Sequence, residues 1–478
     1  MASADVGFAQ VRGFSQFRRG NRSVTPPLSR SDTTNLYLPR PSALSMKPRL
    51  AVAACLAVLL AALGTASASP KAAAPAQFQV LAHVNPGIAY VADVWAHRGH
   101  AYLSSHKGRQ GCPADGVLAY DLRNPRKPRL VSRFARVAGT WTEKTIVRSV
   151  KTPAFTGDVA VTSFQGCSRS SFRGFGLYDV TNPRTPRRLA LVRTDPRGSH
   201  EIWLAAAGRK AFVYTAIIAS EYLSAPDFDP DTRSARTPGR ADFRIYDVSE
   251  PRRPREVGSW GAWRELGIHP NNGLAGDPQN LVHSVITNQT ATRAYVSYWD
   301  LGTVILDVSD PASPRYLGRT AFAPGESGNA HSTAVGRGET LLLETHETSG
   351  GDVTLHDVSD PRRPVRLSAF SLPADVIAEG FGDGNRSGLA DSVHDPELAG
   401  TVAYFSWYRQ GVVAADVSDP AHPRFLARFL PTPALDREAL FCPGDRCRSV
   451  CGVALGPGYV LGSDMLGGLW VLRLTRPA

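Results

Sequence analysis

The sequence predicts an all-β fold, a seven-bladed β-propeller of four-stranded blades. Two observations lead to this fold: one corner motif recurs along the chain, and the segments between corners lack the 3.6-residue period of a helix. Successive corners lie about 50 to 70 residues apart, which is the length of four strands with their loops. Such a period is typical of a propeller, because each blade is one repeat.

The corner is clearest in residues 294–317, AYVSYWDLGTVILDVSDPASPRYL, where an apolar strand runs into Asp-Val-Ser-Asp-Pro. Ser or Asn ahead of Pro opens a turn, and Pro removes a backbone donor and fixes φ, so strand pairing stops there. The six corners are YDLRNPRKPRL from Tyr120, YDVTNPRTPRRL from Tyr178, YDVSEPRRPREV from Tyr246, LDVSDPASPRYL from Leu306, HDVSDPRRPVRL from His356 and ADVSDPAHPRFL from Ala415.

The seventh unit is incomplete at the C-terminal end. GGLWVLRLTRP, from Gly467, matches the third strand of a unit, and no fourth strand follows it. QFQVLAHV, at Gln77–Val84, is similar to the strand that follows the other corners. We therefore expect this N-terminal strand to close the ring, which leaves no sheet edge open.

These repeats resemble the LVIVD-repeat family, in which the same strand precedes Asp-[Val/Ile]-Ser-[Asp/Asn]-Pro. The resemblance covers most of the chain after Gln77. It implies a β-propeller and says little about activity.

The sequence divides into four segments. Residues 1–45 are rich in Arg, Ser and Pro, and they are interpreted as a mis-annotated or disordered extension. Residues 46–68 have a basic start, an apolar stretch and a small-residue cleavage site, which predicts a signal peptide and a secreted or extracytoplasmic protein. Residues 69–76 form a linker, and 77–478 the propeller. The alternative, a membrane anchor, would need a span of about 20 apolar residues, so we expect no transmembrane span in the mature chain.

The positive charge does not predict a nucleic-acid partner. The formal net charge is +12, and much of the arginine stands in the corners, without interleaved aromatic residues for base stacking. A solvated basic rim that discourages sheet aggregation accounts for it.

Cysteine usage fits an oxidising compartment. Cys112 and Cys167 occupy equivalent loops of neighbouring units and are expected to pair. Cys442 and Cys447 are expected to close their own loop, which leaves Cys451 as a buried thiol. A zinc cluster of Cys442, Cys447 and Cys451 is the alternative, although it lacks a CxxC pair.

Four successive units place a histidine at one position before the second strand: His200, His283, His331 and His394. The corresponding positions in the other units are assigned to Asp93 or a neighbour, to Arg148, and to Arg448 or Ser449. The loops between second and third strands face the same end of the channel, and their candidate ligand-binding residues are Asp300, His346, Glu347, Tyr408 and Arg409.

Two function classes remain open. The first is a recognition module that binds a small molecule, a glycan or a protein at the polar mouth of the channel. The second is a metal-dependent enzyme, most plausibly an oxidoreductase, with Fe, Cu or Zn held by the four histidines, because neutral imidazole is a common ligand of these metals. A structural role, in which the histidines hydrogen-bond neighbouring backbone, is the alternative to both. No catalytic residue is assigned.

A weaker signal is a calcium loop in DGNRSGLAD. Asp383, Asn385, Ser387 and Asp391 follow the order of calcium ligands. His394 stands where the bidentate glutamate belongs, so the pattern is incomplete.

Overall fold

The computed structural model describes residues 75–475, except 109–110, 274–279, 327, 349, 381–391 and 443–445. The predicted extension 1–45 and signal peptide 46–68 therefore lie outside the described residues, as does most of the linker 69–76. Within the described ranges, no helix is long and apolar enough to cross a membrane.

Seven antiparallel sheets form the blades, as predicted from the repeats. Blade I contains β2 (Val91–His97), β3 (His100–Ser105), β4 (Val117–Asp121) and β5 (Arg129–Phe134). Blade II contains β7 (Thr145–Lys151), β8 (Thr156–Gly166), β9 (Gly174–Asp179) and β10 (Arg187–Arg193), with β6 (Thr140–Trp141) added beside β8. Blade III contains β11 (Ile202–Ala207), β12 (Lys210–Ala216), β13 (Phe243–Asp247) and β14 (Arg255–Trp260).

The remaining blades repeat this order. Blade IV contains β15 (Ser284–Thr287), β16 (Arg293–Ser297), β17 (Thr303–Asp307) and β18 (Arg315–Arg319). Blade V contains β19 (Ala330–Gly336), β20 (Leu341–His346), β21 (Val353–Asp357) and β22 (Val365–Phe370). Blade VI contains β23 (Pro396–Ala399), β24 (Val402–Trp407), β25 (Gly411–Asp416) and β26 (Arg424–Phe429). Blade VII contains β29 (Val450–Gly456), β30 (Tyr459–Asp464), β31 (Gly468–Thr475) and β1 (Gln77–Val84).

Three short helices and a small two-stranded sheet are added to the blades in the described residues. The helix α1 (Ser220–Leu223) connects β12 to β13 within blade III. Between blades lie α2 (Ala262–Leu266), α3 (Ala374–Gly380) and the sheet of β27 (Ala434–Leu435) and β28 (Arg446–Cys447).

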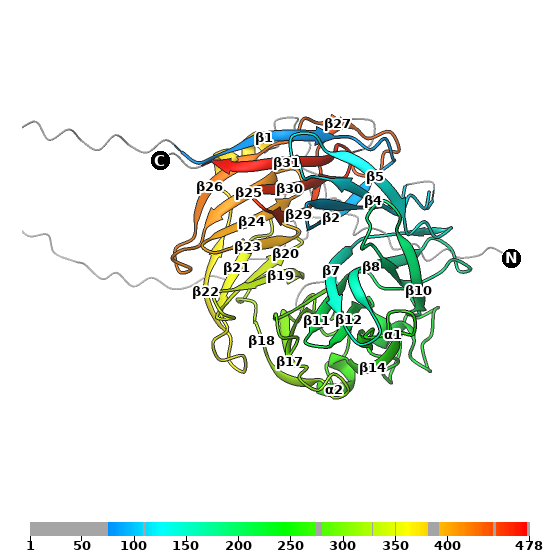
Figure 1. The fold of residues 1–478 in the computed structure, drawn as a ribbon. Coiled ribbons are helices and arrows are strands. Elements are labelled where there is room, and N and C mark those ends of the chain that lie inside the picture. Colours follow the sequence, from blue (N-terminus) through cyan, green and yellow to red (C-terminus); the bar gives the residue numbers. More distant parts are fainter. Residues whose placement is uncertain are drawn as a thin grey trace, which may run out of the picture. The chain divides into compact units, whose positions relative to one another are not determined.

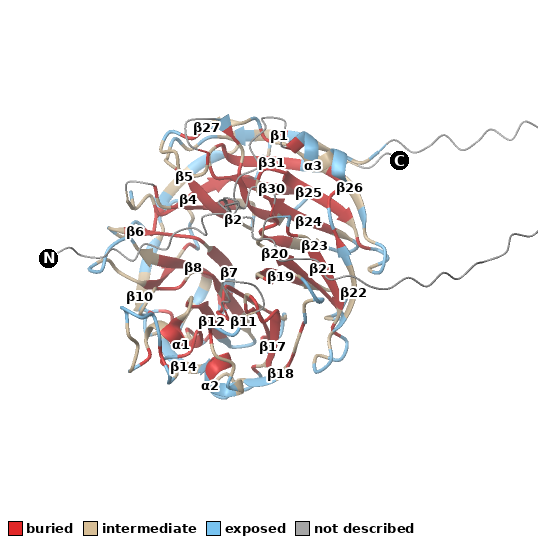
Figure 2. Ribbon diagram, turned by 180° about the vertical axis from the view of Figure 1, so that it is seen from behind, coloured by how far each residue is buried: buried red, intermediate tan, exposed pale blue. Residues whose placement is uncertain are grey.

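The first strands of the blades surround a common centre (Figure 1). Each contacts the next in the order β2, β7, β11, β15, β19, β23, β29, and β29 in turn contacts β2. The second and third strands of the blades are buried almost throughout, whereas the fourth strands are largely half-buried or exposed at the rim (Figure 2). The core is therefore a set of layers between neighbouring sheets.

The N-terminal strand β1 pairs with the C-terminal strand β31. The antiparallel register runs from Gln77 opposite Thr475 to Val84 opposite Leu469. His83 stacks on Trp470 with ring centroids 3.7 Å apart, and its Nε2 lies 2.8 Å from the Gly467 carbonyl oxygen. This is the strand pairing that the unfinished seventh repeat predicts.

The aspartates explain why each corner has its sequence. Asp307 Oδ1 accepts hydrogen bonds from the Ser309 backbone N–H at 3.0 Å and from its hydroxyl at 2.6 Å, and Asp310 accepts from Ala312 N–H. These side chains supply acceptors where the proline interrupts pairing. The same bond to the residue two positions on is made by Asp121, Asp179, Asp247, Asp357 and Asp416.

The corner also joins one blade to the next. The Ser132 hydroxyl of β5 donates to the Pro183 carbonyl in the next corner, and Ser368 of β22 donates to Pro420. At the equivalent place in β14, a Cβ on Gly258 would lie 1.9 Å from the Pro311 carbonyl oxygen. Only a small or hydroxyl-bearing residue therefore fits where the fourth strand meets the next corner.

The cysteines pair as the sequence predicts. Cys112 joins Cys167, linking the β3–β4 and β8–β9 loops, and Cys442 joins Cys447. Cys451 is free and buried. The alternative zinc cluster is wrong, because two of its three thiols form a disulfide. Two disulfides fit an extracellular protein.

The β1–β31 pairing should contribute measurably to stability. Leu81 is 8% exposed, whereas its neighbour Val80 is 44% exposed. Leu81→Ala should lower the free energy of unfolding by about 2 kcal/mol or more, and Val80→Ala should change it by less than about 0.5 kcal/mol. Guanidinium unfolding measures both. Equal effects of the two variants would show that β1 does not pack in solution as it does here.

The corner aspartate should stabilise the fold in a pH-dependent way. Hydrogen bonds from Ser309, followed by the Arg315 guanidinium, lower the pKa of Asp307 to about 2. Because this pKa is depressed, the stabilisation is complete above pH ~4, the ordinary Asp range, and is lost as pH falls towards 2. Asp307→Asn should cost about 1 kcal/mol at pH 7, and the cost should shrink below pH 4.

Urea unfolding at pH 7, 5 and 3 tests this. Asp310→Asn is the matched control, because both amide oxygens still accept their backbone N–H, but within the described residues only Asp307 of the two makes an ion pair, with Arg315. A cost of Asp307→Asn that stays constant down to pH 3 would contradict the assignment.

Candidate functional site

The strand registers bring equivalent residues of all seven blades together. Each blade contributes one equivalent residue, which lies just before its first strand or near the start of that strand. These seven residues are called here the histidine level: Ala92, Glu143, His200, His283, His331, His394 and Cys451. The next residue of each blade forms the lysine level: Asp93, Lys144, Glu201, Ser284, Ser332, Asp395 and Gly452. Because the first strands surround one centre, side chains of each level can meet across blades.

The four predicted histidines form a continuous arc. Ring centroids are 4.5 Å apart between His200 and His283, 4.0 Å between His283 and His331, and 4.1 Å between His331 and His394. His283, His331 and His394 are 6%, 1% and 4% exposed. The sequence prediction that these residues share one structural position is thus matched by the geometry.

Hydrogen bonds orient the imidazole rings. His331 Nδ1 lies 3.1 Å from the His394 carbonyl oxygen and 2.8 Å from the Ser332 hydroxyl. The carbonyl can only accept, so its bond forms in the tautomer that carries the proton on Nδ1 and leaves a lone pair on Nε2. Within the described residues, His331 Nε2 is buried without a hydrogen-bond partner. His200 Nδ1 lies 2.7 Å from Gln165 Oε1, which in the same way directs the His200 Nε2 lone pair inward. Bare, oriented imidazole nitrogens are what a metal ion requires.

A carboxylate completes one candidate donor set. Glu347 Oε2 lies 3.6 Å from His331 Nε2, and its Oε1 accepts from the Tyr408 hydroxyl at 2.5 Å. Donor atoms of His283, His331 and Glu347 lie within 4.8 Å of one another. Donors on one ion lie roughly 3 to 3.6 Å apart, so side-chain shifts of about 1 Å would suffice. His331, His394 and Asp395 form a second such group.

A buried lysine occupies the centre of the lysine level. Lys144 Nζ lies 3.1 Å from Asp93, 3.1 Å from Glu201 and 2.8 Å from Asp395. In the described part of the chain, Lys144 is the one Lys or Arg side chain within ion-pair distance of these three carboxyls, and Glu143 and Glu347 have none. With Glu143 and Glu347 nearby, the centre carries an excess of acidic groups.

Burial dominates the protonation of these groups. It lowers the pKa of His200 to about 3 and of His394 to about 4, and it lowers the pKa of His283 and His331 well below the ordinary range. All four imidazoles are therefore neutral near pH 7.

The carboxyls of the centre are shifted in both directions. Burial raises the pKa of Asp93 and Glu347 to about 7 and of Glu143 to about 8. Burial alone would also raise the pKa of Asp395, but the charge of Lys144 outweighs it and lowers that pKa.

Aromatic side chains cover the histidine arc. Trp141 meets His200 edge-on at 6.2 Å, Trp299 lies 4.8 Å from His283, and Tyr408 lies 5.2 Å from His394. Lys107 Nζ lies 5.7 Å from the Trp141 ring. The arc thus combines polar donor atoms with apolar walls, the composition of a small-molecule site.

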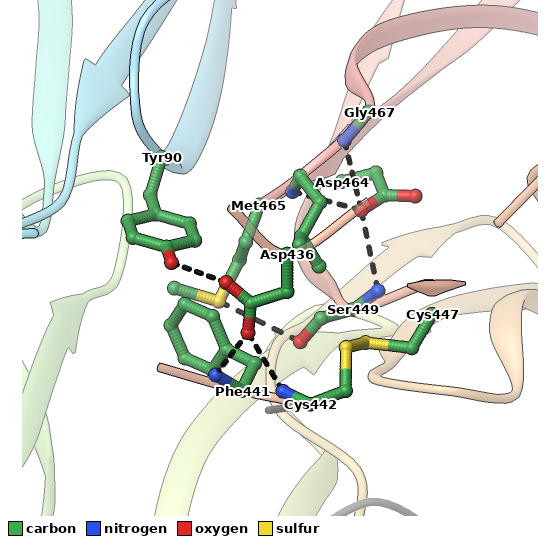
Figure 3. Close-up of a disulfide and its surroundings, with 10 residues drawn as sticks. Tyr90, Asp436, Phe441, Cys442, Cys447, Ser449, Asp464, Met465 and Gly467 are labelled. Atoms are coloured by element: carbon green, nitrogen blue, oxygen red, sulfur yellow. Dashed lines mark hydrogen bonds between the residues drawn. A yellow bond between two sulfur atoms is a disulfide. The ribbon is translucent and has the colours of Figure 1, made fainter. Parts of the chain in front are cut away.

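The Cys442–Cys447 disulfide loop is anchored beside this site (Figure 3). Asp436 accepts hydrogen bonds from the Tyr90 hydroxyl and from the backbone N–H groups of Phe441 and Cys442. Phe441 in turn contacts His106, with ring centroids 5.8 Å apart. These bonds fasten the loop to blade I just before β29, the strand that carries Cys451.

Three other predicted ligand-binding residues have different surroundings. His346 Nε2 lies 3.1 Å from Glu344 and Nδ1 lies 3.1 Å from Asp352, so its two nitrogens are engaged within blade V. Asp300 accepts the Asn329 N–H, which holds the loop ahead of His331. Arg409 is buried beside Tyr408. The calcium loop Asp383, Asn385, Ser387 and Asp391 lies outside the described residues.

Sequence reasoning missed Glu143 and Lys144. It assigned their position to Arg148, which instead lies over the Trp203 ring at 4.5 Å. The β7–β8 hairpin is longer than the others, so counting back from the second strand gave the wrong residue. Cys451, rather than Arg448 or Ser449, occupies the position in blade VII. Comparing TWTEKTI with GSHEIWL directly could have revealed Glu143 and Lys144.

Removing the central lysine should destabilise the fold strongly. Lys144→Met leaves three buried carboxylates without their cation, so the free energy of unfolding should fall by about 3 to 5 kcal/mol at pH 7. Lys151→Met, on the exposed end of the same strand, should change it by less than about 0.5 kcal/mol. Denaturant unfolding measures both. A Lys144→Met protein as stable as wild type would mean that the lysine does not neutralise this cluster.

Comparisons with known proteins agree with the fold. The LVIVD repeat family matches residues 294–321. No curated protein sequence matches the chain. Among solved structures, Raptor of Chaetomium thermophilum aligns with a TM-score of 0.51 and 11% identity, over 83% of this chain and 29% of Raptor, a likeness of fold alone. The chain thus carries an LVIVD repeat at residues 294–321 and has the architecture of a seven-bladed β-propeller, which together support the LVIVD-repeat family.

Proposed function

We propose that this protein is an exported ligand-binding propeller whose histidine arc holds a transition-metal ion. The donors are His283 and His331, with Glu347 as the anionic ligand, and His200 stands beside His283. The single observation that carries this proposal is the His331 Nε2 atom. It is buried and has no hydrogen-bond partner among the described residues, and a proton on Nδ1, facing the His394 carbonyl oxygen, leaves its lone pair available.

Two further contacts and the donor types support a metal rather than a purely structural arc. The Tyr408 hydroxyl donates a hydrogen bond to Glu347 Oε1 and so orients the carboxylate, as hydrogen-bond partners of metal ligands do. His200 Nε2 and His283 Nε2 lie 3.0 Å apart, which is compatible either with a hydrogen bond or with two donors on one ion. Imidazole with carboxylate suits Fe, Cu or Zn.

The ligand class follows from burial. The His331 side chain is 1% exposed and that of Glu347 is 12% exposed, so a protein surface or a glycan chain does not reach them. A small molecule that fits between the aromatic walls does. Three protein donors leave a coordination position open for it.

The same open position favours a second candidate function, a metal-dependent oxidoreductase. Catalytic metal sites keep three protein ligands and one exchangeable position, whereas structural sites are closed by four. Iron or copper at the site would favour this candidate, since zinc has no redox chemistry of its own.

Metal analysis tests the proposal. Protein recovered from the exported fraction without an affinity tag, and reconstituted with Fe, Cu or Zn salts, should bind the ion in stoichiometric amount. His331→Ala should lose one equivalent and keep its melting temperature within a few degrees, because the site lies at the centre of the ring and not in a layer between blades. His422→Ala is the matched control, since His422 is an exposed corner residue.

Two results would reject the metal site. One is the absence of bound ion after reconstitution, and the other is a His331→Ala protein with full metal content. If that variant instead loses about 1 to 3 kcal/mol of stability with no change in metal content, the arc is structural.

A further inference from the structure

The histidine level contains a second group of donors beyond the arc. Glu143, His394 and Cys451 come from blades II, VI and VII, and one donor atom of each lies within 4.8 Å of the others. Cys451 Sγ lies 3.6 Å from Glu143 Oε1 and 3.9 Å from both ring nitrogens of His394. All three residues are buried.

We propose that Glu143, His394 and Cys451 form a second metal site, which takes a thiophilic divalent ion of the Zn²⁺ class. Thiolate sulfur at about 2.3 Å and nitrogen or oxygen at about 2.0 to 2.2 Å from one zinc lie roughly 3.5 Å apart in a tetrahedral arrangement. The sulfur-to-donor distances of 3.6 and 3.9 Å come close to this value before any ion is bound.

The surroundings of Glu143 are the second observation. This carboxylate is buried, and no Lys or Arg side chain of the described ranges lies within ion-pair distance of it. Its neighbour in sequence, Lys144, pairs instead with Asp93, Glu201 and Asp395. Among the described residues, the Glu143 side chain has one hydrogen-bond partner, the Cys451 thiol, which is a weak donor. A buried carboxyl without a cation is neutralised either by a proton or by a bound metal ion, and an ion that binds Glu143 takes the place of that proton.

The state of Cys451 fits this role. The four other cysteines of the described chain are paired, and Cys451 remains a free thiol at the centre of the ring. On binding, the ion displaces the thiol proton to solvent, and the thiolate becomes its sulfur ligand. No electron transfer is involved.

The two sites lie next to each other and use different donors. The His331 ring belongs to the first and the His394 ring to the second, with centroids 4.1 Å apart. The second site does not depend on the first, because it uses none of His283, His331 and Glu347. The centre of the propeller then holds two neighbouring ions, one bound by nitrogen and oxygen and one that includes sulfur.

Cobalt(II) is the probe, because a thiolate ligand gives it a charge-transfer absorption band in the near ultraviolet and histidine or carboxylate alone does not. The metal-free full chain is titrated with Co²⁺, and Zn²⁺ is then added. We expect the thiolate band to appear and Zn²⁺ to abolish it. Cys451→Ser should lack the band, while His422→Ala, which changes an exposed corner residue, should keep it.

Two more variants separate this proposal from the first site. His331→Ala should keep the thiolate band, so that loss of the first site leaves the second measurable. Glu143→Gln preserves the size of the side chain and should weaken Co²⁺ binding at the thiolate site at least tenfold. A wild-type protein without the band, a band that survives in Cys451→Ser, or unchanged affinity in Glu143→Gln would each overturn the assignment.

Discussion

The convergence of seven first strands on one centre is the constraint on which the rest of this structure depends. It brings side chains of different blades into a shared space from which water is largely excluded. A charge at such a position must be compensated by a residue of another blade, because a buried unpaired charge is too costly. The ion pairs of Lys144 with Asp93, Glu201 and Asp395 are one solution to that requirement, and these four residues come from four different blades.

The ring itself depends on local chemistry at its rim. In each corner, proline ends the strand and an aspartate accepts a hydrogen bond from the backbone of the turn. The carbonyl group of the corner proline contacts the fourth strand of the preceding blade. The pairing of β1 with β31 applies the same architecture to strands from opposite ends of the chain. The centre can therefore contain unfavourable groups, because the layers between blades and the rim supply the stability.

The two levels of the centre differ in chemistry although they are adjacent in sequence. The lysine level is ionic and internally paired, so it is suited to holding the blades together. The histidine level has neutral imidazoles, bare nitrogen atoms and a free thiol, so it lacks internal compensation. Polar atoms that the protein itself does not satisfy point to something the protein binds. Three aromatic residues, Trp141, Trp299 and Tyr408, pack against the histidine rings.

The sequence by itself determined the blade number, the corners, both disulfides and the shared position of His200, His283, His331 and His394. These features are local, or they emerge when the repeated units are aligned with one another. Only the tertiary structure decided which charges meet. Lys144 and Asp395 are 251 residues apart, and Cys451 and Glu143 are 308 apart. It also turned His346 towards Glu344 and Asp352 in its own blade. Contacts across the ring join residues of non-adjacent blades, and the length of each hairpin sets which residue arrives there, so no local pattern encodes them.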